Sequence, residues 1–470
     1  MEVGKDAKSQ FTIRTSDRRT FRRCLRKWDW QSSLRQNLQR KGTEQNINFW
    51  FGSAIHFCME DYEGLNKFGD PRRALYAYYH AFDSKDLPLG AEANYSLGIS
   101  MLTYYLTWKE RHNKQTQFET VWLNPATYQP MSPDEVGAVP AVEISFSIPL
   151  HVYAVVDVET DKIIDSFFYG SEVQQRLCDL PVPGVWTPEA DPDTVYYMDS
   201  LYPEQPIKVK EIFYHGTIDR IVKDTYGRYW LWDWKTAKKA DTAKLATDDQ
   251  VSAYLWAAAK LFPFPVYGFV YMQMVKDRVQ EPRRLKNGEL SVDKRQKTTY
   301  SLLRQAILED YGSVQKAPTK LVAFLNYMAD QEEPEGDRFM RWDFVKRTKE
   351  QLEMTEQSIY GELDDMLNPN KVCYPAPTRD CIWDCPFRDA CIMTDMMDSS
   401  ALAEFLMGYE QRPHEENGNH DEWRDRIVWP VSEEAMIPMD EVLSFNAALV
   451  LDMGEDTPVN EFEFYYEEDC

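Results

Sequence analysis

Two aspartates and a lysine fall in segments that alternate as β-strands do. In "RYWLWDWK" (228–235) tryptophan occupies every second position. Successive strand side chains point to opposite faces, so Asp233 and Lys235 are predicted on the face away from the tryptophans. Asp219, in "GTIDRI", falls on the preceding strand. Two carboxylates on neighbouring strands can share a divalent cation, and a lysine beside them can orient a water or offset phosphate charge. This set of groups suits phosphodiester hydrolysis.

Three further side chains are predicted to reach the same place. Gln250 and Tyr254, in "DDQVSAYLWAA", are four residues apart and therefore share one face of a helix. His56, in "FGSAIHFCMEDYE", lies on a helix that begins just after Gly52, and a neutral imidazole is a ligand for manganese-like metals. Glu60, one turn later, is the alternative metal-facing residue. Taken alone, His56 fits a half-buried helix histidine better than a ligand.

The cysteines are distributed unevenly. Of eight in the chain, Cys381, Cys385 and Cys391 crowd into eleven residues. In an intracellular chain, such a cluster indicates metal binding before disulfides.

In their order, "GSAIH", "GTIDRI", "DWK" and "QVSAY" resemble the motifs of the RecB-like exonucleases of the PD-(D/E)XK nuclease superfamily. The resemblance covers most of residues 11–395. It extends to the iron–sulfur branch, which includes the CRISPR-associated RecB-like exonucleases and the nuclease end of the AddB subunit, because one cysteine precedes the core and three follow it. The loop "EPRRLKNGELSVDKRQKTTY" resembles a segment of phage-encoded members.

This resemblance implies an α/β fold with the mixed sheet of restriction endonucleases flanked by helices, a helical N-terminal region and a C-terminal iron–sulfur region. It implies that Mg²⁺ or Mn²⁺ is held by His56, Asp219 and Asp233, with the Trp234 carbonyl as a further ligand. Lys235 would be the catalytic lysine, and Gln250 and Tyr254 would support the active site and DNA. The implied activity is that of a metal-dependent DNA exonuclease in recombination, repair or replication, with single-stranded 5′ ends as the first substrate to test.

By the same resemblance, a [4Fe–4S] cluster bound by Cys24, Cys381, Cys385 and Cys391 would join the two ends of the domain. Two features depart from the family pattern. Three residues separate Cys381 from Cys385 where two are common, and Leu25 follows Cys24 where proline is common. Cys373 is therefore an alternative ligand, and four thiolates could equally hold a structural zinc ion.

The elements that must position these residues follow from hydrophobic periodicity. Residues 14–27 carry seven Arg/Lys against one aspartate, which suits either a solvated helix face or a phosphate track. The tryptophans 230, 232 and 234 are most simply core packing. Helices are expected at 14–27, 46–66, 71–87, 91–115, 246–261, 298–329 and 342–366, and strands at 140–150, 209–223, 228–235 and 265–275.

Charge and composition suggest the domain organisation. The chain has 470 residues and a net charge of −24, of which nineteen Asp/Glu and three Arg in residues 401–470 contribute −16. We expect a nuclease domain over 1–400, interrupted by an insertion at 151–206, with the cysteine region 371–395 closing onto Cys24. The acidic extension 401–470 is expected to be solvated, or alternatively to cover a DNA groove or bind a partner protein.

The expected location is cytoplasmic. The start "MEVGKDAKSQ" lacks a secretion signal, and the longest apolar run, from Ala253, is interrupted by Lys260, Pro263 and Pro265, so no membrane partner is expected. Two alternatives to the exonuclease remain: a catalytically silent DNA-binding or assembly factor on the same scaffold, and a zinc-stabilised adaptor.

Overall fold

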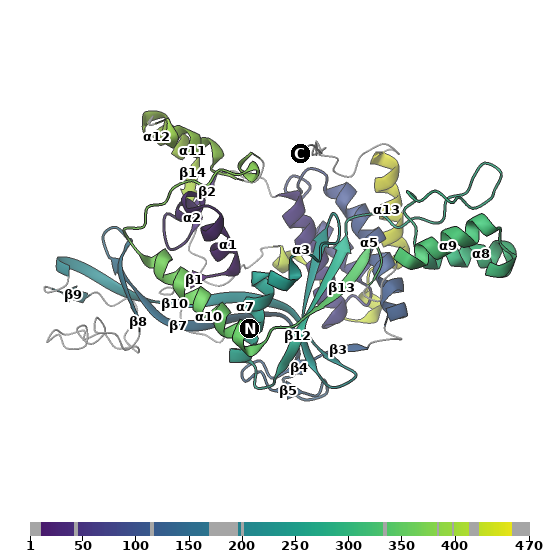
Figure 1. Cartoon of the computed structure of the whole chain (residues 1–470), viewed down its shortest axis with the longest axis horizontal. Coiled ribbons are helices and arrows are strands. Elements are labelled where there is room, and N and C mark those ends of the chain that lie inside the picture. Colours follow the sequence, from purple (N-terminus) through teal and green to yellow (C-terminus); the bar gives the residue numbers. More distant parts are fainter. Residues whose placement is uncertain are drawn as a thin grey trace.

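A mixed β-sheet forms the centre of the molecule (Figure 1). The computed structural model describes residues 11–41, 46–112, 117–168, 196–198, 202–331, 336–382, 385–396, 399–412 and 423–453. Within the sheet, β11 and β12 are parallel and the other neighbours along the main path are antiparallel. The strand order is β13 (Met340–Val345), β12 (Val266–Val275), β11 (Tyr229–Ala237), β10 (Tyr202–Asp224), β7 (Val142–Asp157) and β8 (Ile163–Phe168).

Several short strands lie beside this main path. Three of them pair with β10, namely β1 (Phe11–Ile13), β3 (Phe118–Thr120) and β9 (Tyr196–Met198). A separate small sheet contains β5 (Pro130–Met131), β4 (Trp122–Leu123) and β6 (Val139–Pro140).

The predicted hairpin is present as β10 and β11. Its turn is organised by Asp224, whose carboxylate accepts hydrogen bonds from the Tyr226 and Arg228 amides and from the Trp230 indole. The turn fixes a register in which Ile221 pairs with Leu231 and Arg220 with Trp232. Continued by one residue, that register puts Asp219 opposite Asp233.

The tryptophan face of β11 packs into the larger core, as predicted. Trp234 has no exposed surface, and Trp230 and Trp232 are almost fully buried. They share a cluster with apolar residues of α3 (Ile47–Glu63), α4 (Pro71–His80) and α5 (Ala91–His112). These helices therefore cover one face of the sheet.

A second core covers the other face. Ile221 and Leu231 pack there with apolar side chains of α7 (Asp249–Leu261), α10 (Lys349–Leu367), α1 (Thr15–Arg23) and α2 (Leu25–Gln31). Asp248 caps α7 by accepting from the Val251 amide, and Thr348 with Gln351 forms a capping box on α10. Helix α7 and strand β12 lie where the sequence predicted them.

The predicted basic helix at 14–27 is two helices. Cys24 takes an extended conformation between them, with φ −159° and ψ 108°. Arg18 is fully buried, with Nε 2.7 Å from Glu362 of α10 and Nη1 3.4 Å from Asp249 of α7. Arg22 pairs with the same two carboxylates. Both arginines hold α1 against α7 and α10, and the phosphate track is wrong for Arg18, which is fully buried.

Two strands are longer than predicted. The pairing of β7 with β10 runs from Ile144 opposite Ile218 to Asp157 opposite Ile207. The expected insertion at 151–206 thus begins and ends in regular strand, while 169–195 and 199–201 lie outside the described residues. The helix expected at 342–366 is also wrong at its start, because 340–345 forms β13 at the sheet edge and α10 begins only at Lys349.

A helical hairpin follows β12 and has its own small core. It consists of α8 (Tyr300–Tyr311) and α9 (Thr319–Gln331), packed through Leu303, Ile307, Leu321 and Leu325. Gly312 ends α8 with φ +71°, a conformation that favours glycine. The hairpin lies at one end of the molecule, at the right of Figure 1.

The described part of the acidic extension is not a solvated tail. Trp423 and Ile427 are buried in the larger core, and Phe445 of α13 (Met439–Met453) contacts Tyr76, Tyr79 and Tyr95. Nearer the cysteines lie α11 (Arg388–Asp395), α12 (Ser399–Leu406) and β14 (Tyr409–Gln411), which pairs with β2 (Leu38–Arg40). No helix among the described residues is long and apolar enough to span a membrane.

Candidate active site

Acidic residues from three adjacent strands meet at one level of the sheet. Asp219 lies opposite Asp233 in the register of β10 with β11. On the other side of β10, the register that pairs Ile144 with Ile218 puts Glu143 opposite Asp219 when it is continued by one residue. All three side chains are at least partly buried.

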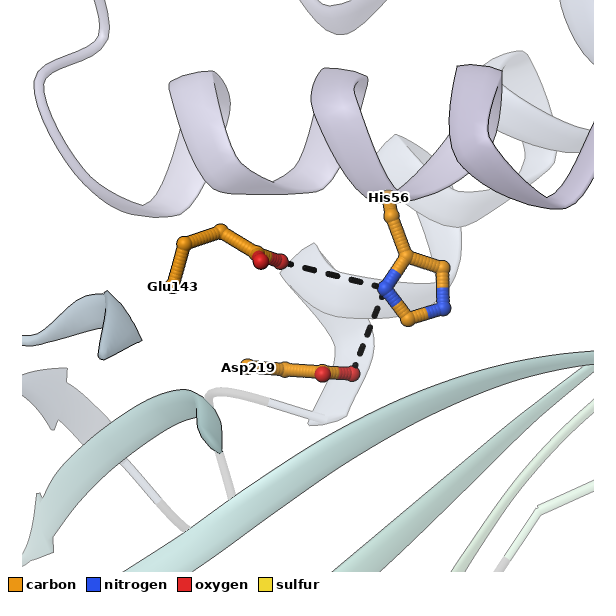
Figure 2. A group of neighbouring side chains, drawn as sticks. All are labelled: His56, Glu143 and Asp219. Atoms are coloured by element: carbon orange, nitrogen blue, oxygen red, sulfur yellow. Dashed lines mark ion pairs between the residues drawn. The ribbon is translucent and has the colours of Figure 1, made fainter. Parts of the chain in front are cut away.

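Helix α3 brings a histidine to these acids. His56 points from the helix toward Glu143 and Asp219, as Figure 2 shows, with its Nδ1 3.4 Å from Asp219 Oδ2 and 3.9 Å from Glu143 Oε1. Close approach of α3 to β7 depends on Gly64, the residue after the helix, because a Cβ there would lie 2.7 Å from the side chain of Val142. The residue next to Val142 is Glu143, so this contact fixes the helix beside the acid.

The charges in this group change one another's protonation. Burial opposes the charged imidazolium, but the carboxylates of Asp219 and Glu143 together outweigh burial and raise the pKa of His56 to about 9. Burial also raises the pKa of Asp219, against the opposing effect of His56.

Lys235 and Gln250 both donate to Asp233. Lys235 Nζ lies 2.7 Å and Gln250 Nε2 3.4 Å from Asp233 Oδ1. Burial raises the pKa of Asp233 to about 6 although Lys235 opposes this. Burial disfavours the Lys235 ammonium as well, but Asp233 and Asp219 outweigh it and raise its pKa, so the lysine is cationic.

Tyr254 lies over the same site, one turn of α7 beyond Gln250. Its pKa is raised to about 12, first by burial and then by the charge of Asp233. The ring of Phe146 packs against it edge to face, with ring centroids 5.9 Å apart. Gly216 of β10 makes room for both rings, since a Cβ there would lie 2.6 Å from Phe146 and 3.3 Å from Tyr254.

A buried ion network anchors α3 on the opposite face of β10. Glu63 lies 2.9 Å from Arg220 and 2.6 Å from Lys109, and it also accepts from the Tyr105 hydroxyl at 2.6 Å. Burial raises the pKa of Glu63, but Arg220 and Lys109 outweigh burial and hold the pKa below its ordinary value. Because Arg220 follows Asp219 and Glu63 is two turns after His56, this network sets the distance between helix and strand.

The donor set fits a divalent cation. His56, Glu143 and Asp219 each offer one ligand atom within 4.8 Å of the others. Oε1 of Glu143 and Oδ2 of Asp233 are buried without a hydrogen-bond partner, and such orphaned carboxylate oxygens suit a hard cation. Asp233 is not a member of this group of three but lies next to it, opposite Asp219. Hence the structure brings together His56, Asp219, Asp233, Lys235, Gln250 and Tyr254, the side chains singled out from the sequence.

Glu60 is not metal-facing. Its carboxylate makes a bidentate pair with Arg424 of the C-terminal extension, at 3.1 and 2.7 Å. The alternative ligand proposed from the sequence is therefore wrong.

Glu143 was missed in the sequence. Its segment, "PAVEISFSIPL", is predicted to be a strand, but an acidic residue in a strand does not by itself indicate a metal ligand. The residue gains meaning only from the register of β7 with β10, whose segments are far apart in the chain. Glu143 also has φ +46°, in the left-handed region, which is uncommon for a residue other than glycine.

The cysteine segments also come together. Cys24 lies at the junction of α1 with α2, and Arg26 of α2 donates to Cys391 Sγ at 3.3 Å. Burial raises the pKa of Cys385, and the nearby thiols of Cys381 and Cys24 contribute. Cys373 instead donates to the Lys371 carbonyl. Among the described residues, no three of these sulfur atoms gather within 4.8 Å of one another.

Comparison with known protein families identifies a match. A family model described as the PD-(D/E)XK nuclease superfamily matches residues 15–392. No curated protein matches the chain.

Proposed function

This chain belongs to the PD-(D/E)XK nuclease superfamily, whose members are generally metal-dependent nucleases, and we propose that it is a RecB-like DNA exonuclease acting on single-stranded ends. The observation that carries the proposal is the meeting of Glu143, Asp219 and Asp233 on three adjacent strands, with His56 above them and Lys235 beside them.

In the proposed mechanism, His56, Glu143, Asp219 and Asp233 would hold Mg²⁺ or Mn²⁺, and the Trp234 carbonyl would be a further donor. When bound, the cation lowers the pKa of a water and offsets charge on the phosphate. Lys235 is cationic, so its part is to donate a hydrogen bond to the water or to a phosphate oxygen, and the charge that develops in the transition state falls within its reach.

Gln250 and Tyr254 position the reacting groups. The Gln250 amide donates to the same carboxylate oxygen as Lys235, and it therefore holds Asp233 in one rotamer. Tyr254 keeps its proton at neutral pH, because its pKa is about 12. Its hydroxyl is therefore a donor for DNA phosphate at the edge of the site.

We also propose that Cys24, Cys381, Cys385 and Cys391 bind a [4Fe–4S] cluster. Four thiolates on one zinc ion lie roughly 3.8 Å apart, given a bond of about 2.3 Å to each sulfur. A cluster places them on four separate irons and hence further apart. The arrangement of one cysteine before the nuclease core and three after it supports the cluster over zinc.

The proposed biological setting is DNA recombination, repair or replication, in a phage-encoded protein. This follows only from the resemblance of the motifs and of the loop at 281–300.

The first experiment compares wild-type protein, purified without oxygen, with Asp233→Ala on end-labelled single- and double-stranded DNA. Cleavage of linear single strands with Mg²⁺ or Mn²⁺, lost in Asp233→Ala and retained in Asp293→Ala, is the expected result. Asp293 is a matched control because it pairs with Arg295 in an exposed loop. Circular single strands should resist the enzyme. DNA binding without cleavage under every metal would instead identify a catalytically silent scaffold.

The cluster is tested separately with Cys385→Ser and Cys373→Ser. The first variant should lose iron, the visible absorbance of the cluster and thermal stability, while the second keeps all three. Zinc in place of iron, or unchanged metal content and melting in Cys385→Ser, would overturn the assignment.

A further inference from the structure

One stripe of α3 is open to solvent and contains His56. Positions 49, 52, 53, 56 and 60 recur every three or four residues and are exposed or partly exposed, whereas 50, 51, 54, 55 and 57–59 are buried. At 3.6 residues per turn these five positions share one face of the helix. At one end of the stripe Glu60 is paired with Arg424. The other end, N-terminal to His56, is Phe49.

Phe49 is exposed although it is adjacent to core residues in the chain. Its side chain is 75% exposed, while its neighbours Trp50 and Phe51 have no exposed surface. Single exposed apolar residues are common, so exposure alone is weak evidence for a binding role. The position matters more, since Phe49 is seven residues from His56 and thus about 10 Å along the same face.

Among the described residues, the helix surface at Gly52, between Phe49 and His56, is open. A Cβ placed on Gly52 would meet no atom within 4 Å. The next position is Ser53, a small polar residue that is exposed. The stripe therefore carries no bulky side chain at positions 52 and 53, between Phe49 and the proposed metal ligand His56.

Positive charge lies beside Phe49. Lys276 Nζ donates to the Asn48 side chain at 2.9 Å, and the Lys276 amide donates to the Ala237 carbonyl at 2.7 Å. Lys238 follows Ala237, so both lysines leave the ends of the parallel strands β11 and β12 together. Partial burial and the charge of Lys238 lower the pKa of Lys276, which is the effect of two ammonium groups held near each other. A phosphate between them would relieve that repulsion.

We propose that the Phe49 ring stacks on a base of single-stranded DNA, and that Lys276 and Lys238 hold the adjoining phosphates. Base stacking on an exposed aromatic beside basic side chains is the usual way in which proteins bind single strands without reading sequence. A stacked strand advances about 3.4 Å per nucleotide, so the base lies about three nucleotides from the phosphate at His56. This subsite rests on the proposed function, because it assigns a substrate contact to that site.

The test measures stacking directly. Oligothymidylates carrying a single 2-aminopurine at successive positions from one end are bound with Ca²⁺ in place of Mg²⁺, and fluorescence and affinity are recorded. The wild-type protein should quench the probe at one or two positions only. Phe49→Ala should lose that quenching and bind about tenfold more weakly, whereas Phe49→Trp should keep both. Tyr226→Ala is the matched control, since Tyr226 is 80% exposed but lies in the β10–β11 turn.

A second variant separates binding from folding. In Gly52→Leu, the leucine side chain should obstruct the exposed face of α3 and weaken binding of the same oligonucleotides. The melting temperature of this variant should stay level or rise, because glycine is a poor helix former. Unchanged affinity in both Gly52→Leu and Phe49→Ala would overturn the subsite.

The outcomes distinguish this subsite from the proposed activity. Position-specific quenching without cleavage under any metal would keep the stacking and reject the exonuclease. Cleavage that is unaffected by Phe49→Ala, with quenching unchanged, would keep the exonuclease and reject the stacking. Neither quenching nor cleavage would reject both.

Discussion

The carboxylate of Asp219 accepts a hydrogen bond from the backbone amide of Trp234 at 2.9 Å, and Trp234 is the residue between Asp233 and Lys235. Through this bond the strand that carries one acid is tied to the strand that carries the other acid and the lysine. The bond uses Oδ2, the same oxygen that faces His56. Helix α3, β10 and β11 are thus joined at one carboxylate, and displacement of any one of them would disturb the whole site.

Replacing Glu143 should weaken metal binding rather than folding. Its Oε1 is buried without a hydrogen-bond partner. The negative charge that Glu143→Gln removes would therefore interact only with a bound cation or with His56. We expect cleavage at low Mn²⁺ to fall about 100-fold and to recover in part as Mn²⁺ is raised, a loss typical of disturbed metal sites.

The check is a Mn²⁺ titration of both cleavage rate and melting temperature. Ligand binding stabilises the wild type as metal is added, and Glu143→Gln should need more metal for the same gain. Glu159→Gln, at an exposed position beyond β7, serves as the control. An equal response of Glu143→Gln and wild type would remove Glu143 from the ligand set.

The buried network of Glu63 predicts a dependence of stability on pH. The pKa of Glu63 is lowered in the folded protein. A lowered carboxyl pKa contributes stability above the unfolded value, about 4.3, and that contribution is lost as pH falls through the folded pKa.

Glu63→Gln should therefore cost about 3 kcal/mol or more at pH 7, since it leaves Arg220 buried without its carboxylate. Urea unfolding at several pH values measures this. The difference between wild type and variant should shrink as pH falls below about 4, and a difference that grew on acidification would contradict the assignment.

Arg18 should be far more important for stability than its neighbour Arg19. Arg18 is fully buried between Glu362 and Asp249, whereas the Arg19 side chain is 49% exposed and 3.4 Å from Asp248. Removing one partner from a buried ion pair costs about 3–5 kcal/mol, and an exposed pair contributes about 1 kcal/mol or less.

Denaturant unfolding of Arg18→Ala and Arg19→Ala tests this contrast. Comparable losses in the two variants would show that α1 is not held by the ion pairs. Because α7 carries Gln250 next to Asp249, Arg18→Ala should also lower the cleavage rate.

Truncation of the C-terminal extension should unfold the larger core. Trp423 packs against Phe57 and Tyr78, with ring centroids 5.3 and 4.5 Å apart, and only 7% of it is exposed. Trp423→Ala should cost about 3–5 kcal/mol, as for other large core truncations.

Val428→Ala is the matched control in the same segment, because Val428 is 84% exposed. Its unfolding free energy should change by less than about 0.5 kcal/mol. If Trp423→Ala melts like wild type, the extension does not belong to the core in solution.

Local pattern was sufficient for the hairpin and its catalytic candidates. The two-residue alternation of "WLWDWK" sets which face each side chain takes, and a short turn fixes the partner strand, so Asp219, Asp233 and Lys235 could be assigned together. The i, i+4 spacing of Gln250 and Tyr254 is equally local. These relations depend on backbone geometry within about 40 residues.

Other features depend on contacts between distant segments, which no local period encodes. Glu143 becomes a candidate ligand only because β7 pairs in one register with β10. The segment 340–345 alternates for too few residues to reveal an edge strand, so the sequence predicts a helix over most of it. From the sequence alone, the arginines of α1 and the acidic residues of the extension are predicted to be solvated. Tertiary packing instead pairs Arg18 with Glu362 and buries Trp423 against Phe57, because burial and charge pairing are properties of the folded neighbourhood rather than of the residue.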